Sequence, residues 1–217
     1  MRRTSGAALL LFTSLALISC GHDRSAPPVV TQILSDPVSD GDIARDPATN
    51  TYTITQGNAQ SLFAGVDPAT GREYRAFLDF PLTGTNGIRC DAGIVSAALD
   101  IVINSIIPQP LTATIPIRID LVAFQPPTLV ESDFDRTLQP ALATITLNPP
   151  ISQADFGRHA TIDVTPLMNE AQRSCQTNFQ LRIMEDLGAA SPGIIEINDT
   201  IGSNRSLLAP LLQIEHY

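Results

Sequence analysis

The amino-acid sequence predicts an all-β protein, an antiparallel β-sandwich with one short helix near residues 165–173. Two observations support this fold class. Apolar and polar residues alternate with a period of two in several segments after residue 50, which is typical of half-buried antiparallel strands. Turn-forming clusters of Pro, Asp, Asn and Gly separate these segments, and many short strands between polar turns are characteristic of sandwiches and barrels.

The alternation is clearest in five segments, residues 74–82, 95–104, 114–123, 179–184 and 212–216. In the first of them, the even-numbered residues from Tyr74 to Leu82 are apolar, and Arg75, Phe77 and Asp79 occupy the opposite face. We therefore expect strands that are buried on one face only.

Turns and the helix have their own local signals. Residues 46–50 and 67–71 read Asp-Pro-Ala-Thr-Asn and Asp-Pro-Ala-Thr-Gly, which predicts two similar tight turns, because Pro presets φ and Asn or Gly accepts a positive φ. Thr165 as the N-cap and Pro166 in the first turn predict a helix that ends near Arg173.

The composition is that of an acidic globular chain. Of its 217 residues, 43% are hydrophobic, and the formal net charge is −9. The apolar fraction can supply a core, and the length favours a single domain. The excess of acids argues against a nucleic-acid partner, because phosphate contacts need a concentrated basic face. All 13 basic residues are Arg, which excludes lysine Schiff-base chemistry.

The N-terminus predicts export and lipidation. Two Arg precede a short apolar stretch, and Leu-Ile-Ser-Cys at 17–20 resembles the lipobox of bacterial lipoproteins, in which the Cys carries the lipid. We expect a signal peptide over residues 1–19, a lipidated tether over 20–35 that starts at Cys20, and one β-sandwich domain over 36–217. Gly21 after the Cys favours the outer membrane of the cell envelope. The alternative is an ordinary signal peptide with an incidental Cys.

Five segments, in order along residues 60–217, resemble the DNRLRE domain family of exported jelly-roll modules. They are residues 75–82 (RAFLDFPL), 94–99 (IVSAAL), 162–165 (IDVT), 178–181 (NFQL) and 209–217 (APLLQIEHY). Members of this family are mostly non-catalytic, carbohydrate-binding-like modules on secreted or surface proteins. The resemblance therefore implies a jelly-roll sandwich and a binding role.

No catalytic or metal-binding motif is visible in the sequence. His22, His159 and His216 form no zinc-binding pattern, and the G-x-S-x-G motif of serine hydrolases is absent. We expect no catalytic residues, no metal and no cofactor, and hence no enzyme.

An acidic stretch near the start of the domain has two interpretations. The side chains of Asp36, Asp40, Asp42 and Asp46 could supply oxygen ligands to a structural Ca²⁺. The spacing does not match a calcium loop, however, and Asp and Gly are common in turns. We favour an exposed, turn-rich hairpin.

Aromatic residues that could lie at the surface are the candidates for sugar contact, and they are Tyr52, Tyr74, Phe124, Phe134 and Phe156. Phe134 is flanked by Asp133 and Asp135, so its ring could stack on a sugar while the carboxylates accept hydroxyl hydrogen bonds. We take Phe124, Phe134, Asp133 and Asp135 as possible ligand contacts. The alternative is that each Phe fills an end of the sandwich.

Two cysteines remain after Cys20. Cys90 precedes the strand predicted at 95–104, and Cys175 precedes the one at 179–184, so both lie at strand entrances. An even number of Cys in an exported protein predicts a disulfide between them. The alternative is two buried thiols.

Two function classes fit these observations. The first is a non-catalytic, lipid-anchored envelope protein that presents its β-sandwich to another envelope protein or has a structural purpose. The second is a surface-displayed module that binds a polysaccharide. A flat apolar patch favours the first class, and exposed aromatic residues in one groove favour the second.

Overall fold

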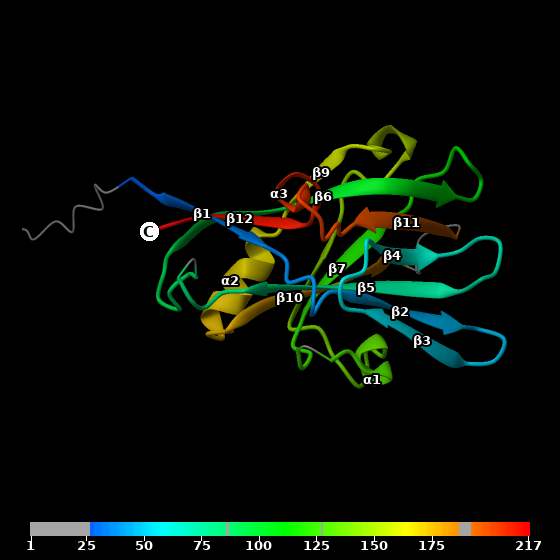
Figure 1. Ribbon diagram of the computed structural model, residues 1–217, viewed down its shortest axis with the longest axis horizontal. Helices are drawn as coiled ribbons and strands as arrows, with labels where there is room; N and C mark the ends of the chain where they lie inside the picture. The colour runs from blue at the N-terminus through cyan, green and yellow to red at the C-terminus, as the bar shows by residue number, and fades with distance from the viewer. Residues whose placement is uncertain (1–26, 86, 127, 187–191) are drawn as a thin grey trace, which may run out of the picture.

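The computed structural model describes residues 27–85, 87–126, 128–186 and 192–217, and its twelve strands belong to one continuous antiparallel sheet (Figure 1). The strands are β1 (Val29–Leu34), β2 (Gly41–Asp46), β3 (Thr51–Gln56), β4 (Ser61–Val66), β5 (Glu73–Pro81), β6 (Ile94–Pro108), β7 (Ile117–Val122), β8 (Ala143–Thr146), β9 (His159–Asp163), β10 (Asn178–Glu185), β11 (Gly193–Asn198) and β12 (Leu211–His216). The helices are α1 (Glu131–Phe134), η1 (Gln153–Asp155), α2 (Thr165–Arg173) and α3 (Arg205–Leu208).

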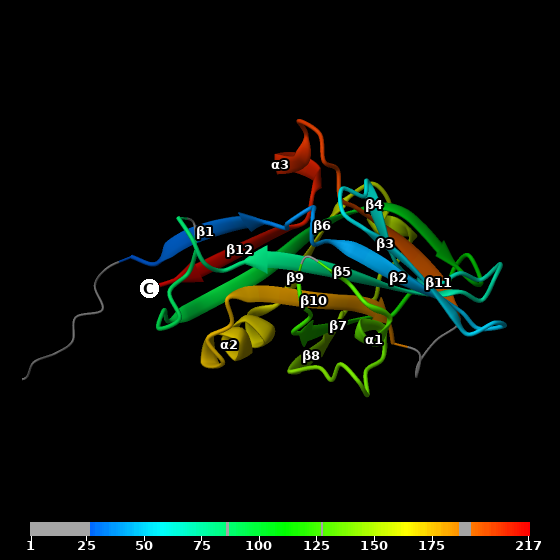
Figure 2. The same ribbon diagram turned by 60° about the horizontal axis from the view of Figure 1, so that its bottom comes forward.

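The sheet folds back on itself at β5. One edge of β5 pairs with β10 along residues 76–81 and with β4 at residues 73–74, and the other edge pairs with β2. From β4 the sheet continues through β11 to β6 and β9, whereas from β10 it continues through β7 to β8. Two layers therefore face each other, as in a sandwich, which confirms the predicted fold class (Figure 2).

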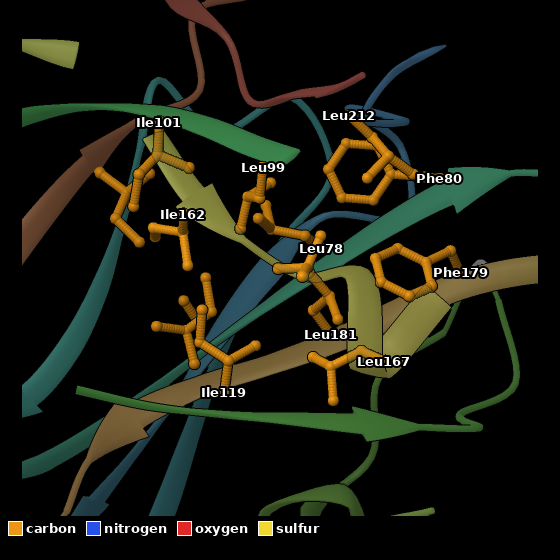
Figure 3. Packing of buried hydrophobic residues seen from close by; sticks show 14 of the residues in the cluster. Leu78, Phe80, Leu99, Ile101, Ile119, Ile162, Leu167, Phe179, Leu181 and Leu212 are labelled. Carbon is orange, nitrogen blue, oxygen red and sulfur yellow. The ribbon is translucent and has the colours of Figure 1, made fainter. Parts of the chain in front are cut away.

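The main hydrophobic core lies between these two layers. Figure 3 shows Leu99 of β6 and Ile162 of β9 in one layer opposite Ile119 of β7 and Leu181 of β10 in the other. Leu167 of α2 packs into the same cluster, so this helix covers part of the opening between the layers. Inward and outward residues alternate along these strands, which is why the period-two pattern predicted them.

Local signals predicted the turns and the helix well. In the turns at 46–50 and 67–71, the first Asp accepts a hydrogen bond from the backbone N–H two residues later, and Asn50 and Gly71 have φ of 54° and 71°. The helix α2 spans the predicted residues. The predicted cap is wrong, however: Val164 is the N-cap, and the Thr165 hydroxyl bonds to the backbone of Ala97 in β6.

Three predicted boundaries also differ from the structure. Residues 29–34 form β1, which pairs with β12 along its whole length, so the sheet includes the end of the predicted tether. β6 continues to Pro108 through a bulge beside Ser105, where its pairing with β11 shifts register. The strand predicted at 114–123 is shorter: Ile115 makes only an isolated bridge to Ile151, and β7 begins after Pro116.

A second, smaller core corrects the expectation of strands buried on one face only. Ile43, Phe77, Val122, Phe124, Leu129 and Phe134 form a cluster on the outer face of β2, β5 and β7. Residues 123–126 and 128–142, which include α1, cover this face and contribute Phe124, Leu129 and Phe134 to the cluster. Arg75 of β5 bonds to the carbonyl of Phe134 and is buried beneath this segment. Asp79 is also buried, beside Asn178 of β10, although the alternation placed both residues opposite the core.

A buried ion pair anchors this covering segment. The side chains of Arg182 in β10 and Asp120 in β7 are both 0% exposed, and Nη2 of Arg182 lies 2.8 Å from Oδ2 of Asp120. Nη1 of Arg182 donates to the backbone carbonyls of Asp133 (2.9 Å) and Gln139 (3.1 Å). One guanidinium thus connects the sheet to two points of the segment that covers it, Asp133 and Gln139.

The predicted disulfide is present. Cys90, in the loop before β6, is bonded to Cys175, just after α2, with 5.1 Å between their Cα atoms. Within the described residues, no helix has the length and apolarity required to span a membrane.

The first prediction concerns Arg182. We expect Arg182→Met to lower the free energy of unfolding by about 3 kcal/mol or more, because it leaves the carboxylate of Asp120 and two carbonyls buried without this donor. Urea unfolding followed by circular dichroism measures the change. The exposed Arg158 is a matched control, and Arg158→Met should cost less than about 0.5 kcal/mol. Equal unfolding midpoints for the two variants would contradict this account of the buried pair.

Candidate functional site

A groove lies where the two layers end, between β8 and β9. Its volume is about 290 Å³, and it is lined by residues 145–151 from β8 and the loop after it, by Asp155, and by residues 159–163 of β9. Ile145, Leu147, Ile151 and Ile162 make its floor apolar.

Both walls of the groove are free strand edges. β8 pairs only with β7, and β9 pairs only with β6, so neither has a partner on its other side among the described residues. The backbone N–H of Leu147 donates to the carbonyl of Ile117 in β7, and that of Val164 donates to the carbonyl of Ala97 in β6. These two bonds show which residues direct their backbone groups toward the neighbouring strand. By the alternation of antiparallel pairs, Thr144 and Thr146 of β8 and residues 159, 161 and 163 of β9 direct their N–H and C=O groups outward.

The rim of the groove is mainly acidic. Asp155 and Asp163 line it, and Asp100 of β6 lies beside His159 at its edge, with 2.7 Å between Oδ2 and Nδ1. Hydrogen bonds from the hydroxyl and the backbone N–H of Thr165 lower the pKa of Asp163, so this carboxylate is charged at neutral pH. The groove therefore combines free backbone groups, an apolar floor and negative charge.

The pair of His159 and Asp100 resembles the base and orienting acid of a hydrolase. Catalysis of that kind also needs a nucleophile within hydrogen-bond reach of the imidazole. In the described part of the chain, no Ser, Thr or Cys side chain makes a hydrogen bond to His159. The pair instead joins β9 to β6 across the sheet.

The four predicted ligand-contact residues lie near one another, but not as an open sugar-binding platform. Phe124 and Phe134 are 3% and 2% exposed and belong to the second core, where Phe124 packs edge-on against Phe77. Asp133 accepts a hydrogen bond from the backbone of Val130 and is buried. Burial of both rings corrects the expectation that they are exposed. They are core residues, but they pack on the outer face of the sheet and not at an end of the sandwich, as the alternative had it.

Asp135 is the one member of that set with appreciable exposure. Its Oδ1 accepts hydrogen bonds from the hydroxyl and the backbone N–H of Thr137, which lower its pKa. Of the other aromatic candidates, Phe156 is exposed, whereas Tyr52 and Tyr74 pack against Phe134 and Phe63.

The acidic stretch leads into a hairpin of β2 and β3, as we favoured, with Asp46 at its turn. It is not exposed throughout, however, because the side chains of Asp40 and Asp42 are buried. Oδ1 of Asp40 accepts a hydrogen bond from the backbone N–H of Asp79, and Oδ2 of Asp42 accepts one from Phe63. In the residues that the structure describes, no group of three or more His, Cys, Asp or Glu side chains could hold a metal ion.

Several buried carboxyl groups have a raised pKa. Burial raises the pKa of Asp42 and of Glu185 to about 7 and that of Asp199 to about 6. Perturbed acids are often functional, but Glu185 here accepts hydrogen bonds from the backbone of Val66 and Gly193, and Asp199 accepts one from Arg205. None of the three lines the groove between β8 and β9.

Sequence reasoning did not find this groove. The alternation over residues 143–147 and 159–163 was a usable signal for two further strands. The sequence could not predict that these two strands lack a second neighbouring strand, because strand pairing depends on the whole topology. Searches against models of known protein families and against curated proteins found no match. The resemblance to the DNRLRE family stays a prediction from its five segments.

The raised pKa values predict a pH dependence of stability. Between about pH 5 and about pH 8 the folded state binds more protons than the unfolded state, because these carboxyls are protonated only when buried, so the stability should fall as the pH rises. Asp42→Asn keeps a carbonyl acceptor for Phe63 and removes the charge. The unfolding free energy of the wild type should differ between about pH 5 and about pH 8, and we expect Asp42→Asn to reduce this difference by about 1–2 kcal/mol.

Urea unfolding at both pH values measures this effect. Asp46→Asn is the matched control on the same strand, because the pKa of Asp46 is lowered by hydrogen bonds from Ala48 and Thr49 and the group does not titrate in this window. A stability that increases with pH in the wild type, or an equal effect of both substitutions, would refute the prediction.

Proposed function

We propose that this protein is a non-catalytic, lipid-anchored envelope protein that binds an extended segment of another envelope protein in the groove between β8 and β9. The observation that carries the proposal is the pair of free strand edges that line one groove. An extended segment that adds to a sheet edge gains main-chain hydrogen bonds, and alternate side chains give specificity.

The chemistry of the groove defines the segment that it would take. One set of alternate side chains would face the apolar floor formed by Ile145, Leu147 and Ile162, which favours β-branched or aliphatic residues. The acidic rim at Asp155 and Asp163 favours a segment that carries Arg or Lys. Ordering an extended segment costs conformational entropy, so we expect moderate affinity.

A surface-displayed module that binds a polysaccharide is the second candidate. Its support is Phe156, which is 59% exposed and follows Asp155 at the end of the groove. The burial of Phe124 and Phe134 removes both rings that we took as possible ligand contacts from the accessible surface.

The location follows from the N-terminal sequence, which lies outside the described residues. We propose that Cys20 carries the lipid and that the domain is held at the outer membrane of the envelope. Several acyl chains would make this attachment stable.

A peptide selection tests strand addition. We expect random peptides selected for binding to the domain to be extended and basic, and to lose at least about tenfold in affinity with Thr161→Pro, which removes an outward N–H of β9. Ile54→Pro is the matched control, because Ile54 occupies an outward-facing position on the free edge of β3. Selected peptides that bind Thr161→Pro as well as the wild type would contradict strand addition. Selective binding of oligosaccharides that is lost in Phe156→Ala would favour the second candidate.

Lipidation has a separate test. Cys20→Ala should move the full-length protein from the detergent phase to the aqueous phase on phase separation, because the acyl chains are absent. Cys90→Ala is the control for loss of a different cysteine and should leave the partition unchanged. A Cys20→Ala variant that still partitions into detergent would show that Cys20 is not the anchor.

A further inference from the structure

A second pocket lies on the outer face of the sheet, and it shares no residue with the groove between β8 and β9. Its volume is about 200 Å³, and it is lined by Arg45, Tyr52, Arg75, Phe134, Asp135 and Arg136. We call it the arginine pocket. Three of the 13 Arg of an acidic chain thus surround one small cavity.

Phe134 holds two of these guanidinium groups in place. The guanidinium carbon of Arg75 lies 3.9 Å from the centre of the Phe134 ring, and that of Arg45 lies 5.4 Å from it. Glu73 bonds to both arginines, with 3.1 Å to Nη2 of Arg45 and 2.9 Å to Nε of Arg75. These contacts fix the orientation of the groups before any ligand binds.

The arginines differ in how many donors they have left. Arg75 uses Nε, Nη1 and Nη2 in hydrogen bonds to Glu73 and to the carbonyl of Phe134. Arg45 uses only Nη2, and Arg136 uses only Nε, which donates to Asp120 at 3.2 Å. Since a guanidinium carries five N–H donors, Arg45 and Arg136 keep unused donors on their Nη atoms among the described residues, whereas Nε of Arg45 is buried without a partner.

The exposed charges of the arginine pocket are mainly positive. The side chains of Arg45 and Arg136 are each 38% exposed, whereas those of Glu73 and Asp120, which pair with them, are 8% and 0% exposed. The acids lie beneath the arginines and hold them, and they are not accessible to a ligand. The carboxylate of Asp135, at the rim, already accepts two hydrogen bonds from Thr137.

We propose that the arginine pocket binds the carboxylate or phosphate group of a small anionic ligand. The free donors of Arg45 and Arg136 contact the oxygens, and planar guanidinium groups suit both oxyanions. Tyr52 contributes an aromatic wall beside the anion and favours ligands with a flat apolar part. This site does not depend on the proposed strand addition at β8 and β9.

Nuclear magnetic resonance of the Arg side chains tests the proposal. The purified domain is titrated at constant ionic strength with inorganic phosphate, with benzoate and with benzamide, the neutral analogue of benzoate. We expect saturable shifts of the Nε–Hε signals of Arg45 and Arg136 with phosphate, benzoate or both, and no such shifts with benzamide. The stronger of the two anions identifies the ligand group as a phosphate or a carboxylate.

Substitutions locate the binding site. Arg136→Gln should weaken binding at least about tenfold, and Arg136→Lys should recover only part of it, because a lysine cannot offer paired donors. Arg158→Gln is the control and should bind like the wild type. Backbone amide spectra check that each variant is folded. If Arg136→Gln does not fold, Arg45→Gln provides the test of binding instead. Equal shifts with benzamide, equal weakening in Arg158→Gln, or no saturable shift with either anion would overturn the proposal.

Discussion

Arg182 is fully buried, and a buried guanidinium needs partners for its charge and its donors. Among the described residues both of its Nη atoms have such partners, whereas Nε has none. The sheet supplies the carboxylate of Asp120, and the covering segment supplies the carbonyls of Asp133 and Gln139. The segment that covers the outer face is therefore fixed at two points by one side chain. The rest of that face depends on this arrangement, because it holds Phe134 over β5 and places Arg136 beside Arg45.

The same interaction explains why the outer face combines charge with apolar packing. The carboxylates of Asp120 and Glu73 pair with several arginines in a small volume, and the guanidinium groups of Arg75 and Arg45 lie over the ring of Phe134. The orientation of each arginine is therefore fixed before a ligand binds, so ligand binding costs little side-chain entropy. Such preorganisation gives a small pocket its selectivity for an anion.

The groove arises from a different constraint. Because the sheet folds back at β5, two of its edge strands, β8 and β9, lie on either side of one groove without pairing. The helix α2 packs against β6, β7 and β8 and covers part of this opening. Most proteins protect free strand edges against pairing with other chains. Two unprotected edges beside one apolar groove therefore suit the binding of an added strand. The charges of Asp155 and Asp163 would restrict which strands can enter.

The sequence alone determined the features that depend on neighbouring residues. The alternation in 74–82 and 179–184, the Asp-Pro turns, the helix at 165–173 and the pairing of Cys90 with Cys175 all follow from patterns within a few residues or from simple counting. What only the tertiary structure decided is which faces and edges are covered. Phe77 and Arg182 look like outward-facing residues in their strands, yet they are buried, because distant segments pack over them. The groove and the arginine pocket also lie between segments far apart in the chain, so their geometry depends on strand pairing that no local pattern records.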